Sequence, residues 1–437
     1  MLPKSVSEVL QHLEETGHQA YAVGGCVRDL LLGRQPDDWD MTTSALPEET
    51  MALFAGHAIP TGLQHGTVTV RWKETSFEVT TFRADGPYAD NRHPSAVFFS
   101  TKLSEDLKRR DFTVNAMALS SSGELTDLFG GQADLKAGII RCVGDPDARF
   151  REDALRIMRA LRFASVLGFS IAPETAAAIR RNRELLRHIA VERIRVEMDK
   201  LLCGQHAASV LRQFPEVIGV FLPELTAMVG FDQRNFHHCY DLWEHTLHAL
   251  KSVQAQPVLR WTMLLHDVGK VECFTVDGGG VGHFYGHDQR GAVVAETICR
   301  RLRFDKRRLQ RITLLIGWHD RDIPRTKKGL RRALYQLGEE ALRQLCEVKR
   351  ADNMAQHPDF RWVQREIDRA EEILDELLAQ ENCFSLRQLA VGGRDMIALG
   401  LRGGAIGAML NSLLEQVVDG NVPNEREALL DWVKKRI

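Results

Sequence analysis

The sequence has no long uninterrupted apolar run, and its cysteines show no paired spacing. Of its 437 residues, 44% are hydrophobic and 27% are charged, as in ordinary soluble globular proteins, and no apolar stretch approaches the length that spans a bilayer. Eight cysteines are scattered from Cys26 to Cys383 without a Cys-x-x-Cys pair, which favours reduced thiols over a disulfide framework, a zinc ribbon or a redox motif. The N-terminal segment lacks the apolar centre of a secretory signal. We therefore expect a cytoplasmic protein and not a membrane protein.

A large net charge is also missing, because the formal charge at pH 7 is only −2 and gives no global attraction to nucleic acid. Basic residues are instead concentrated in the stretches 180–187, 300–311 and 325–332. Any one of these stretches is equally well explained as a solvated helix face, but their repetition in a near-neutral chain favours a polyanion such as RNA as a partner.

The chain contains no internal repeat or low-complexity tract, and its length predicts about three domains. Between residues 20 and 140, short β-branched runs such as 67–70 and 77–81 alternate with turn formers, which predicts an α/β domain with a small sheet. The turn-rich segment 83–94 predicts a loop over the site without a regular element. After Gly144 the pattern is almost wholly helical.

A glycine turn is the first candidate site. The run Tyr21–Val23 predicts a strand, Gly24 and Gly25 allow the backbone to approach a ligand, and Arg28 lies on the turn that follows. A Gly-Gly pair alone is usually only a turn. The combination with an arginine predicts a phosphate-binding element.

Carboxylates follow this turn. If Asp38 and Asp40 lie on a strand, the period of two points both side chains to one face. Glu78 alternates with Phe77 and Val79 on a predicted strand and could supply a third carboxylate to a two-metal phosphoryl transfer site. The alternative for Glu78 is a solvent-facing strand residue. Oxygen ligands beside a guanidinium suit Mg²⁺ bound to a nucleoside triphosphate.

The segment Arg109–Ala116 combines two arginines, an acid, a hydroxyl and an amide. Arg110 and its neighbour could clamp a triphosphate, because an arginine fork matches phosphate oxygens. The alternative is a plain helix N-terminus with Asp111 or Thr113 as its cap.

The segment 149–162 predicts a helix. Asp153, Arg156, Arg159 and Arg162 follow one another at steps of three. An acid beside an arginine offers acceptors and donors that could hydrogen-bond a nucleobase edge; the alternative is a ladder of surface salt bridges. The apolar stripe of this helix consists of Ala154, Ile157, Met158, Leu161 and Ala164.

A separate series of histidines and acids lies in the helical half of the chain. Imidazole and carboxylate groups suit one or two divalent transition-type metals that hold a water. One histidine of this kind is usually structural, but so many in or beside helical patterns are hard to explain that way. The series is His245, His266, Asp267, His287, His319 and Asp352.

Taken together, the glycine turn, Asp38-Trp39-Asp40, Arg109–Ala116 and Glu152–Arg156 resemble the motifs of the bacterial class II tRNA nucleotidyltransferases, the CCA-adding enzymes. The resemblance is strongest over about the first 225 residues, includes Val191–Arg195 and continues through an HD-type phosphohydrolase domain. It implies a multidomain α+β protein with a polymerase-beta-like nucleotidyltransferase α/β head and all-α neck, HD and tail domains. The implied bounds are 1–140 for the head, 141–225 for the neck, 226–355 for the HD domain and 356–437 for the tail.

The resemblance also implies that tRNA, CTP and ATP are substrates. In this family two acids hold Mg²⁺, a glycine and two arginines bind the triphosphate, and an acid with an arginine selects the base as a protein template. The acids that match the Mg²⁺ ligands are Asp38 and Asp40. The residues that match the triphosphate binders are Gly25, Arg28 and Arg110. The residues that match the template are Asp153 and Arg156, with Arg159 and Arg162 beside them.

The second series matches the HD hydrolases. Their H…HD…D pattern and the extra ligands of two-metal versions imply a divalent metal of unknown identity and a possible phosphomonoesterase or cyclic phosphodiesterase activity. The matching ligands are His245, His266, Asp267 and Asp352, with His287 and His319 as the extra pair.

Other functions remain open from sequence alone. A poly(A) polymerase has the same head, and some members of the family add only the cytidines or only the adenosine. An HD phosphohydrolase with an RNA-binding remnant at its N-terminus is a different class, against which the intact Asp38, Asp40, Arg110 and Asp153 argue.

Overall fold

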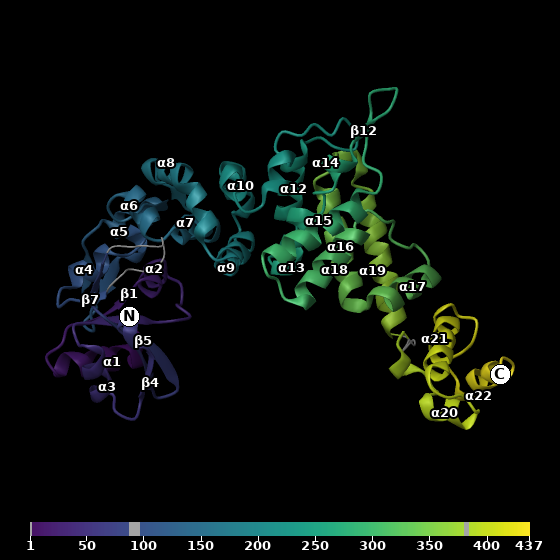
Figure 1. Cartoon of the computed structure of the whole chain (residues 1–437), viewed down its shortest axis with the longest axis horizontal. Helices are drawn as coiled ribbons and strands as arrows, with labels where there is room; N and C mark the ends of the chain where they lie inside the picture. Colours follow the sequence, from purple (N-terminus) through teal and green to yellow (C-terminus); the bar gives the residue numbers. More distant parts are fainter. Residues whose placement is uncertain (1, 87–96, 380–383) are drawn as a thin grey trace. The chain divides into compact units, whose positions relative to one another are not determined.

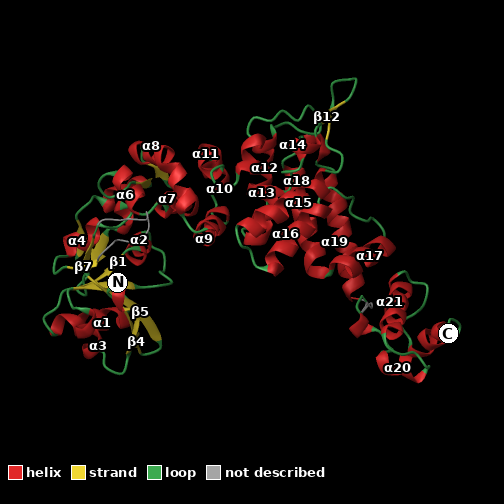
Figure 2. Cartoon of the chain, viewed as in Figure 1, coloured by secondary structure: helices red, strands yellow, loops and turns green. Residues whose placement is uncertain are grey.

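The computed structural model describes residues 2–86, 97–379 and 384–437, and it divides after Pro223 into two compact units (Figure 1). Figure 2 shows that the longer strands gather in the first unit, whereas the second is almost entirely helical. The predicted mixed head and helical remainder are therefore confirmed. None of the helices within the described residues is long and apolar enough to cross a membrane.

A seven-stranded sheet forms the centre of the first unit, in the order β3-β4-β5-β2-β1-β8-β9. The strands β2 and β5 are parallel, and the other neighbours are antiparallel. The predicted strands 67–70 and 77–81 are confirmed, since they fall within β4 and β5. The sheet consists of β1 (Ala20–Val23), β2 (Asp40–Thr43), β3 (Ala58–Gly62), β4 (Thr67–Trp72), β5 (Thr75–Thr81), β8 (Met117–Leu119) and β9 (Leu125–Asp127).

Short helices connect and cover these strands, because each needs only one apolar face to pack on the sheet. In α1, for example, Val6, Val9, Leu10 and Leu13 are all buried at helical spacing. The helices are α1 (Lys4–Glu15), α2 (Gly25–Leu31), α3 (Pro47–Leu53), α4 (Leu103–Lys108) and α5 (Gly131–Ala137).

The predicted loop 83–94 is only partly a loop. Its first residues form β6 (Arg83–Asp85), which pairs antiparallel with β7 (Val97–Phe99). The expectation of no regular element was wrong here, because the pairing partner lies beyond the turn formers. Residues 87–94 of the predicted loop lie outside the described residues.

The helix predicted over 149–162 is in fact two helices. α6 (Pro146–Glu152) ends at Asp153, whose φ of −136° and ψ of 105° are extended, and α7 (Leu155–Leu167) follows. The carboxylate of Asp153 accepts the N–H of Leu155 at 3.0 Å, so an acid that satisfies the start of the next helix competes with helix continuation. The apolar stripe was predicted correctly, because all of its members are buried.

The remaining elements of the first unit are mainly helices. Two short strands, β10 (Ile139–Ile140) and β11 (Ser170–Ile171), pair in parallel. The helices are α8 (Pro173–Asn182), α9 (Val191–Leu202), α10 (Ala207–Gln213) and α11 (Pro215–Ile218).

The second unit contains a helical bundle followed by a smaller group of helices with its own apolar cluster between Leu389 and Val433. The small hairpin of β12 (Thr275–Val276) and β13 (Gly282–His283) interrupts the helices. The helices are α12 (Leu242–Ser252), α13 (Pro257–Leu265), α14 (Lys270–Cys273), α15 (His287–Arg301), α16 (Lys306–Trp318), α17 (Lys327–Leu337), α18 (Glu339–Met354), α19 (Val363–Ala379), α20 (Gly393–Ala398), α21 (Gly404–Val418) and α22 (Arg426–Lys434). The bounds predicted at 140, 225 and 355 stay predictions.

Candidate functional site

The turn between β1 and α2 brings a cation and an acid together. Gly24 precedes α2 with a φ of 83°, which favours glycine. A Cβ built on Gly24 would lie 2.9 Å from Nη1 of Arg110 and 3.9 Å from Oδ2 of Asp40. Any larger residue would therefore displace the Arg110 guanidinium. The predicted close approach of a ligand to this turn stays a prediction.

The acids of this site lie on, or just before, two central strands of the sheet. Asp40 is the first residue of β2 and pairs in register with Glu78 on the parallel neighbour β5, so both side chains leave the same face of the sheet. Asp38 lies in the loop before the strand. The condition that Asp38 and Asp40 lie on one strand is thus not met, because pairing with β5 begins only at Asp40.

As whole residues, Asp38, Asp40 and Glu78 are exposed, whereas the carboxyl group of Asp40 itself is locally buried. The pKa of Asp40 is raised because local burial of its carboxyl group and the nearby Asp38 outweigh the lowering effect of Arg110. A divalent cation would remove this repulsion, and carboxylate oxygens are the ligands that Mg²⁺ prefers. The donor chemistry therefore fits a magnesium ion.

A buried acid on α4 holds Arg110 and its neighbour Arg109. Asp106 on α4 is fully buried and pairs with Arg109 at 2.7 Å and with Arg110 at 3.3 Å. These arginines hold the pKa of Asp106 below its ordinary value, although burial opposes them. The sequence analysis did not single out Asp106, although its spacing of three and four residues from the arginines was a signal.

A cavity of about 260 Å³ lies next to these arginines and is lined by the start of α7, by the break before it, and by residues from two other segments. Its walls are Arg109, Arg110, Asp111, Asp153, Leu155, Arg156, Arg159 and Arg193. The structure thus brings the predicted Arg110, Asp153, Arg156 and Arg159 to one place. A carboxylate and several guanidinium groups around a small cavity can hydrogen-bond the edge of a planar base.

Each charged residue of the proposed template is held by a partner outside the predicted ladder. Asp153 pairs with Arg193 at 3.2 Å, and Arg156 pairs with Glu152 at 2.5 Å. Arg159 pairs with the buried Asp111 at 2.6 Å. These contacts cross from α7 to other elements, so the alternative of a simple surface ladder does not describe the site.

Arg162 lies one turn further along α7 and pairs with Glu197 at 2.7 Å. Its guanidinium lies 4.0 Å from the ring centroid of Phe163, which also has Arg28 at 5.0 Å and Arg159 at 5.4 Å. The aromatic face is thus a common platform for arginines from α2 and α7. Phe163 was not predicted as a site residue.

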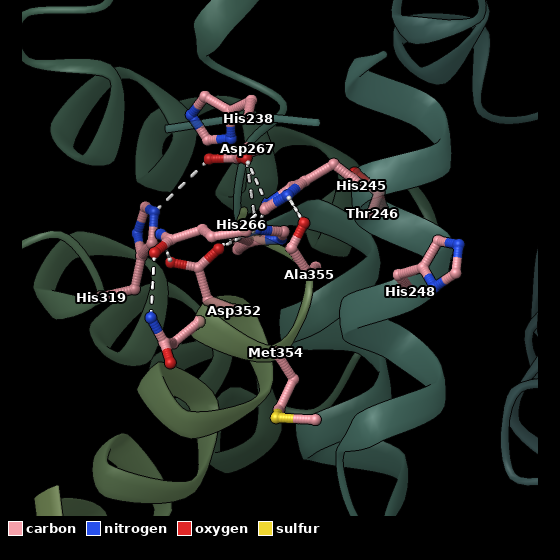
Figure 3. Close-up of polar contacts among 12 residues, drawn as sticks. His238, His245, Thr246, His248, His266, Asp267, His319, Asp352, Met354 and Ala355 are labelled. Carbon is pink, nitrogen blue, oxygen red and sulfur yellow. Dashed lines mark hydrogen bonds and ion pairs between the residues drawn. The ribbon is translucent and has the colours of Figure 1, made fainter. Parts of the chain in front are cut away.

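A second candidate site lies in the second unit, where all six predicted ligands converge in two groups. His245, His266, Asp267 and Asp352 form one group, and Asp267, His287 and His319 form the other, with the ligand atoms of each group within 4.8 Å of one another. Figure 3 shows Asp267 between the imidazoles of His245 and His266 on one side and that of His319 on the other.

Asp267 contributes one oxygen to each group. Its Oδ2 lies 3.3 Å from Nε2 of His245 and 3.2 Å from Nε2 of His266. Its Oδ1 lies 3.5 Å from Nε2 of both His287 and His319. The carboxylate of Asp352 approaches Nε2 of His245 at 2.9 Å. This arrangement suits two cations that share one bridging carboxylate.

Backbone carbonyls fix which nitrogen of each histidine faces the site. Nδ1 of each imidazole lies between 2.7 and 3.2 Å from a carbonyl oxygen, so Nδ1 carries the proton and Nε2 presents a lone pair. Nε2 atoms then meet in pairs at 3.3 Å, His245 with His266 and His287 with His319. Acceptors that face one another in a buried site require a proton or a metal between them, and the residues therefore fit divalent metal ions.

The pKa values of the groups in this cluster also indicate a site that binds cations. Although burial opposes it, the carboxylates of Asp267 and Asp352 raise the pKa of His266 to about 10. The pKa values of both carboxylates are held well below their ordinary range by the cationic groups around them, against the effect of burial. Protons thus take the place of metal cations in the metal-free protein.

A cavity of about 390 Å³ opens onto this cluster, and its lining includes Lys270, His238 and Tyr285. The ammonium of Lys270 lies 2.8 Å from Oδ2 of Asp267 and 3.4 Å from Nε2 of His238. Burial and this ammonium lower the pKa of His238 to about 2, so its imidazole is neutral. A cation beside a metal cluster at the base of a cavity can receive a phosphate group. Neither residue was predicted from the sequence, because Lys270 lies in a short helix without a distinctive pattern and His238 lies in an irregular segment before α12.

Comparisons with known proteins identify the family. A model of the poly A polymerase head domain matches residues 20–141, one of a probable RNA and SrmB-binding site of polymerase A matches 168–228, and one of a putative tRNA nucleotidyltransferase domain 2 matches 290–433. The CCA-adding enzyme of Geobacillus stearothermophilus is 37% identical over 98% of this chain and 96% of its own length. The chain belongs to the family of CCA-adding enzymes.

Other CCA-adding enzymes also match this chain over nearly its whole length. The CCA-adding enzyme of Bacillus velezensis is 34% identical over 97% of this chain and 96% of its own length. The crystal structure of the Bacillus stearothermophilus CCA-adding enzyme in complex with CTP has a TM-score of 0.74 at 33% identity, and covers 100% of this chain and 98% of that chain. A Thermotoga maritima CCA-adding enzyme in complex with tRNA has a TM-score of 0.58 at 19% identity, over 99% and 95% of the two chains, and so shares the fold.

Proposed function

We propose that this protein adds or repairs the 3′-terminal CCA of tRNA without a nucleic-acid template, and that it uses CTP, ATP and Mg²⁺. The observation that carries the proposal is the 37% identity to a CCA-adding enzyme along nearly the whole of both chains. We propose a cytoplasmic location with it, which a tRNA substrate supports.

The residues of the first unit support this function by their positions. Gly24, Gly25, Arg28 and Arg110 form the phosphate side, while Asp153, Arg156, Arg159 and Arg162 form the base side. Asp38 and Asp40 would hold Mg²⁺, with Glu78 beside Asp40 in the sheet. The ion neutralises charge on the triphosphate when it is bound.

The chemistry then needs mainly positioning. The terminal ribose hydroxyl of the tRNA attacks the α-phosphorus in line, the new phosphodiester bond forms, and pyrophosphate leaves with the electron pair of the broken bond. Arg28 and Arg110 orient the phosphates and offset their charge. Asp153 and Arg156 read the base edge from the neighbouring cavity, which makes the protein the template.

A direct assay tests the proposal. The purified protein is incubated with Mg²⁺, labelled CTP or ATP, and tRNA transcripts that end before the first C, after CC or after CCA, beside an unstructured RNA. We expect limited addition to incomplete tRNAs only. Long adenosine tails on every RNA would indicate a poly(A) polymerase, addition to one class of incomplete tRNA would indicate a CC-only or A-only enzyme, and no incorporation would refute the proposal.

We also propose a second activity, metal-dependent phosphohydrolysis at the histidine cluster of the second unit. It is favoured by the bridging position of Asp267 between two groups of ligands. His245, His266 and Asp352 with Asp267 would hold one ion, and His287 and His319 would complete the other. An activated water would attack phosphorus, so a phosphomonoester or phosphodiester would lose its alcohol. Release of nitrophenol from p-nitrophenyl phosphate or its bis ester with Mn²⁺ or Zn²⁺ tests this; no release from either ester with either ion would refute it.

A further inference from the structure

A buried amide lies between the two halves of the transfer site. Asn115 is only 5% exposed. Its Oδ1 accepts a hydrogen bond from Nη1 of Arg28 at 2.8 Å, and its Nδ2 donates to Oδ1 of Asp111 at 3.3 Å. Because a guanidinium only donates and a carboxylate only accepts, the side chain between them must offer an acceptor on one side and a donor on the other.

The Arg28 end of this bridge faces the triphosphate. Nε and Nη2 of Arg28 form a fork with the carboxylate of Asp29 at 2.9 and 2.8 Å, and Nη1 bonds to Asn115. These bonds occupy three of the five N–H groups of a guanidinium. The orientation of the remaining N–H groups, which would meet phosphate oxygens, is therefore set in part by Asn115.

The Asp111 end faces the base. Oδ2 of Asp111 accepts from Nε of Arg159 at 2.7 Å, while Oδ1 accepts the N–H of Phe112 at 2.8 Å. Arg159 and Arg156 hold the pKa of Asp111 below its ordinary value despite its burial, so the group is a carboxylate and Asn115 must be its donor. Arg159 lines the cavity assigned to the base. A continuous chain of hydrogen bonds thus runs from Arg28 to Arg159.

We propose that Asn115 is a positioning residue that couples triphosphate binding at Arg28 to base selection at Arg159; this rests on the transferase function proposed above. When a phosphate binds the Arg28 guanidinium, the guanidinium moves and shifts its partner Asn115. Asn115 in turn shifts the carboxylate of Asp111, which orients Arg159. By linkage, the triphosphate then sharpens discrimination between bases, and the correct base strengthens triphosphate binding by the same factor.

Two substitutions at Asn115 interrupt the chain in different ways. Asn115→Asp keeps the acceptor for Arg28 but places a second carboxylate against Asp111. Asn115→Leu keeps the branching at Cγ, with a larger volume, and removes both hydrogen bonds. In both variants Arg28 retains its fork with Asp29 and its stacking on Phe163, so the fold has support that does not depend on the amide.

Asn182 offers a matched control in the same unit. It is 8% exposed, and its Nδ2 donates to the carboxylate of Asp147 at 2.6 Å. Asn182→Asp therefore creates the same pairing of two carboxylates, but away from Arg28, Asp111 and Arg159. A merely structural role of Asn115 predicts similar consequences for both Asn→Asp variants.

The test compares dissociation constants of the full chain for CTP, UTP, CMP and UMP with Mg²⁺, measured by isothermal titration. The preference for cytosine is the dissociation constant of the uridine nucleotide divided by that of the cytidine nucleotide. In the unmodified protein we expect this ratio to be at least about fivefold larger for the triphosphates, UTP and CTP, than for the monophosphates, UMP and CMP. In both Asn115 variants the two ratios should agree within about twofold, while Asn182→Asp keeps the gap. Equal ratios in the unmodified protein would overturn the proposal even if no variant folds, and a gap that persists in a folded Asn115 variant would do the same.

Incorporation assays separate this inference from the proposed function. If the unmodified protein extends no tRNA, the transferase function itself has failed. If it extends tRNA, we expect misincorporation of UMP to rise in the Asn115 variants and to stay unchanged in Asn182→Asp at equal loss of Tm. If UMP misincorporation rises in proportion to the loss of Tm in all variants, including Asn182→Asp, Asn115 has only a structural role.

Discussion

The two metal-binding regions of this protein differ in how much of each site exists before a ligand arrives. In the first unit, Asp38, Asp40 and Glu78 are exposed residues on, or just before, the central strands β2 and β5. In the second unit, His245 and His266 are fully buried, and Asp267 is 1% exposed. Within the described residues, tight groups of three or more ligand atoms occur only in the second unit.

Burial explains this difference. A buried cluster of acceptors is costly unless a cation neutralises it, so the histidine site needs a resident ion or the protons that replace it. Exposed acids are solvated by water, so leaving them without a cation costs little free energy. They can bind an ion that arrives together with the triphosphate. The first site is therefore completed by its substrate, whereas the second is largely organised by the fold.

The largest expected effect comes from an acid of the first site. Asp40→Ala removes the strand carboxylate closest to Gly24 and Arg110, so nucleotide incorporation should fall by on the order of 10³-fold, while hydrolysis at the histidine site continues. Incorporation of labelled CTP into a tRNA that lacks its 3′ end measures the transferase activity, and nitrophenol release measures the hydrolase activity. Asp37→Ala, at an exposed neighbour, is the control and should keep activity. Retained incorporation in Asp40→Ala would refute the metal assignment.

A ligand of the second site should give the reverse pattern. His266→Ala deletes an imidazole of the first ligand group, so metal-dependent hydrolysis should fall by at least about 100-fold while incorporation is spared. His248→Ala, on the same helix as His245 but absent from both ligand groups, is the control and should keep both activities. Simultaneous loss of hydrolysis and incorporation in a folded His266→Ala protein would show that the two regions are not independent.

Sequence reasoning succeeded at different levels in the two regions. All six members of the histidine series were found from their residue types and their order along the chain, which match the HD hydrolase pattern, and the structure brings them together. In the first unit the motif residues were also found, but their geometry was not. The break at Asp153 depends on a side chain that bonds the N–H of Leu155, and the start of β2 depends on pairing with a distant strand.

The residues that sequence analysis missed share a physical reason. Asn115 acts through a partner on another element, Arg28. Asp106 has only the spacing of three and four residues to its two arginine partners that many ordinary helix pairs share. The same is true of Lys270, whose contact with Asp267 looks like an ordinary helix pair. Hydrogen-bond networks of this kind form only after the chain has folded, so local pattern does not encode them in a readable form.

The pH dependence of metal binding should sharpen the contrast between a resident and a delivered ion. Because the folded pKa of His266 is raised to about 10, the proton on this group stabilises the metal-free protein below about pH 6.5, and the stabilisation is lost as the pH rises through about 10. A metal must displace that proton. The affinity for Mn²⁺ or Zn²⁺ should therefore rise about tenfold per pH unit for each proton displaced between pH 7 and 9.

Isothermal titration of the metal-free full chain in buffers of different ionisation enthalpy measures this proton release. In His266→Ala the release should be smaller by about one proton, whereas Asp40→Ala should leave it unchanged. An affinity that does not vary with pH would mean that the histidines bind metal without a resident proton, and the proposed charge balance of the cluster would be wrong.

The smallest expected effect concerns selectivity. Arg156 lies between the carboxylate of Glu152 and the carbonyl oxygens of Arg109 and Arg149 at the wall of the base cavity. Arg156→Ala should lower discrimination between CTP and UTP by about tenfold and reduce turnover with CTP by less, because the phosphates and their cations are untouched. Arg151→Ala, an exposed arginine on α6, is the control. If Arg156→Ala lowers turnover while selectivity stays constant, Arg156 supports the helix break rather than reading the base, and the template role passes to Asp153 and Arg159.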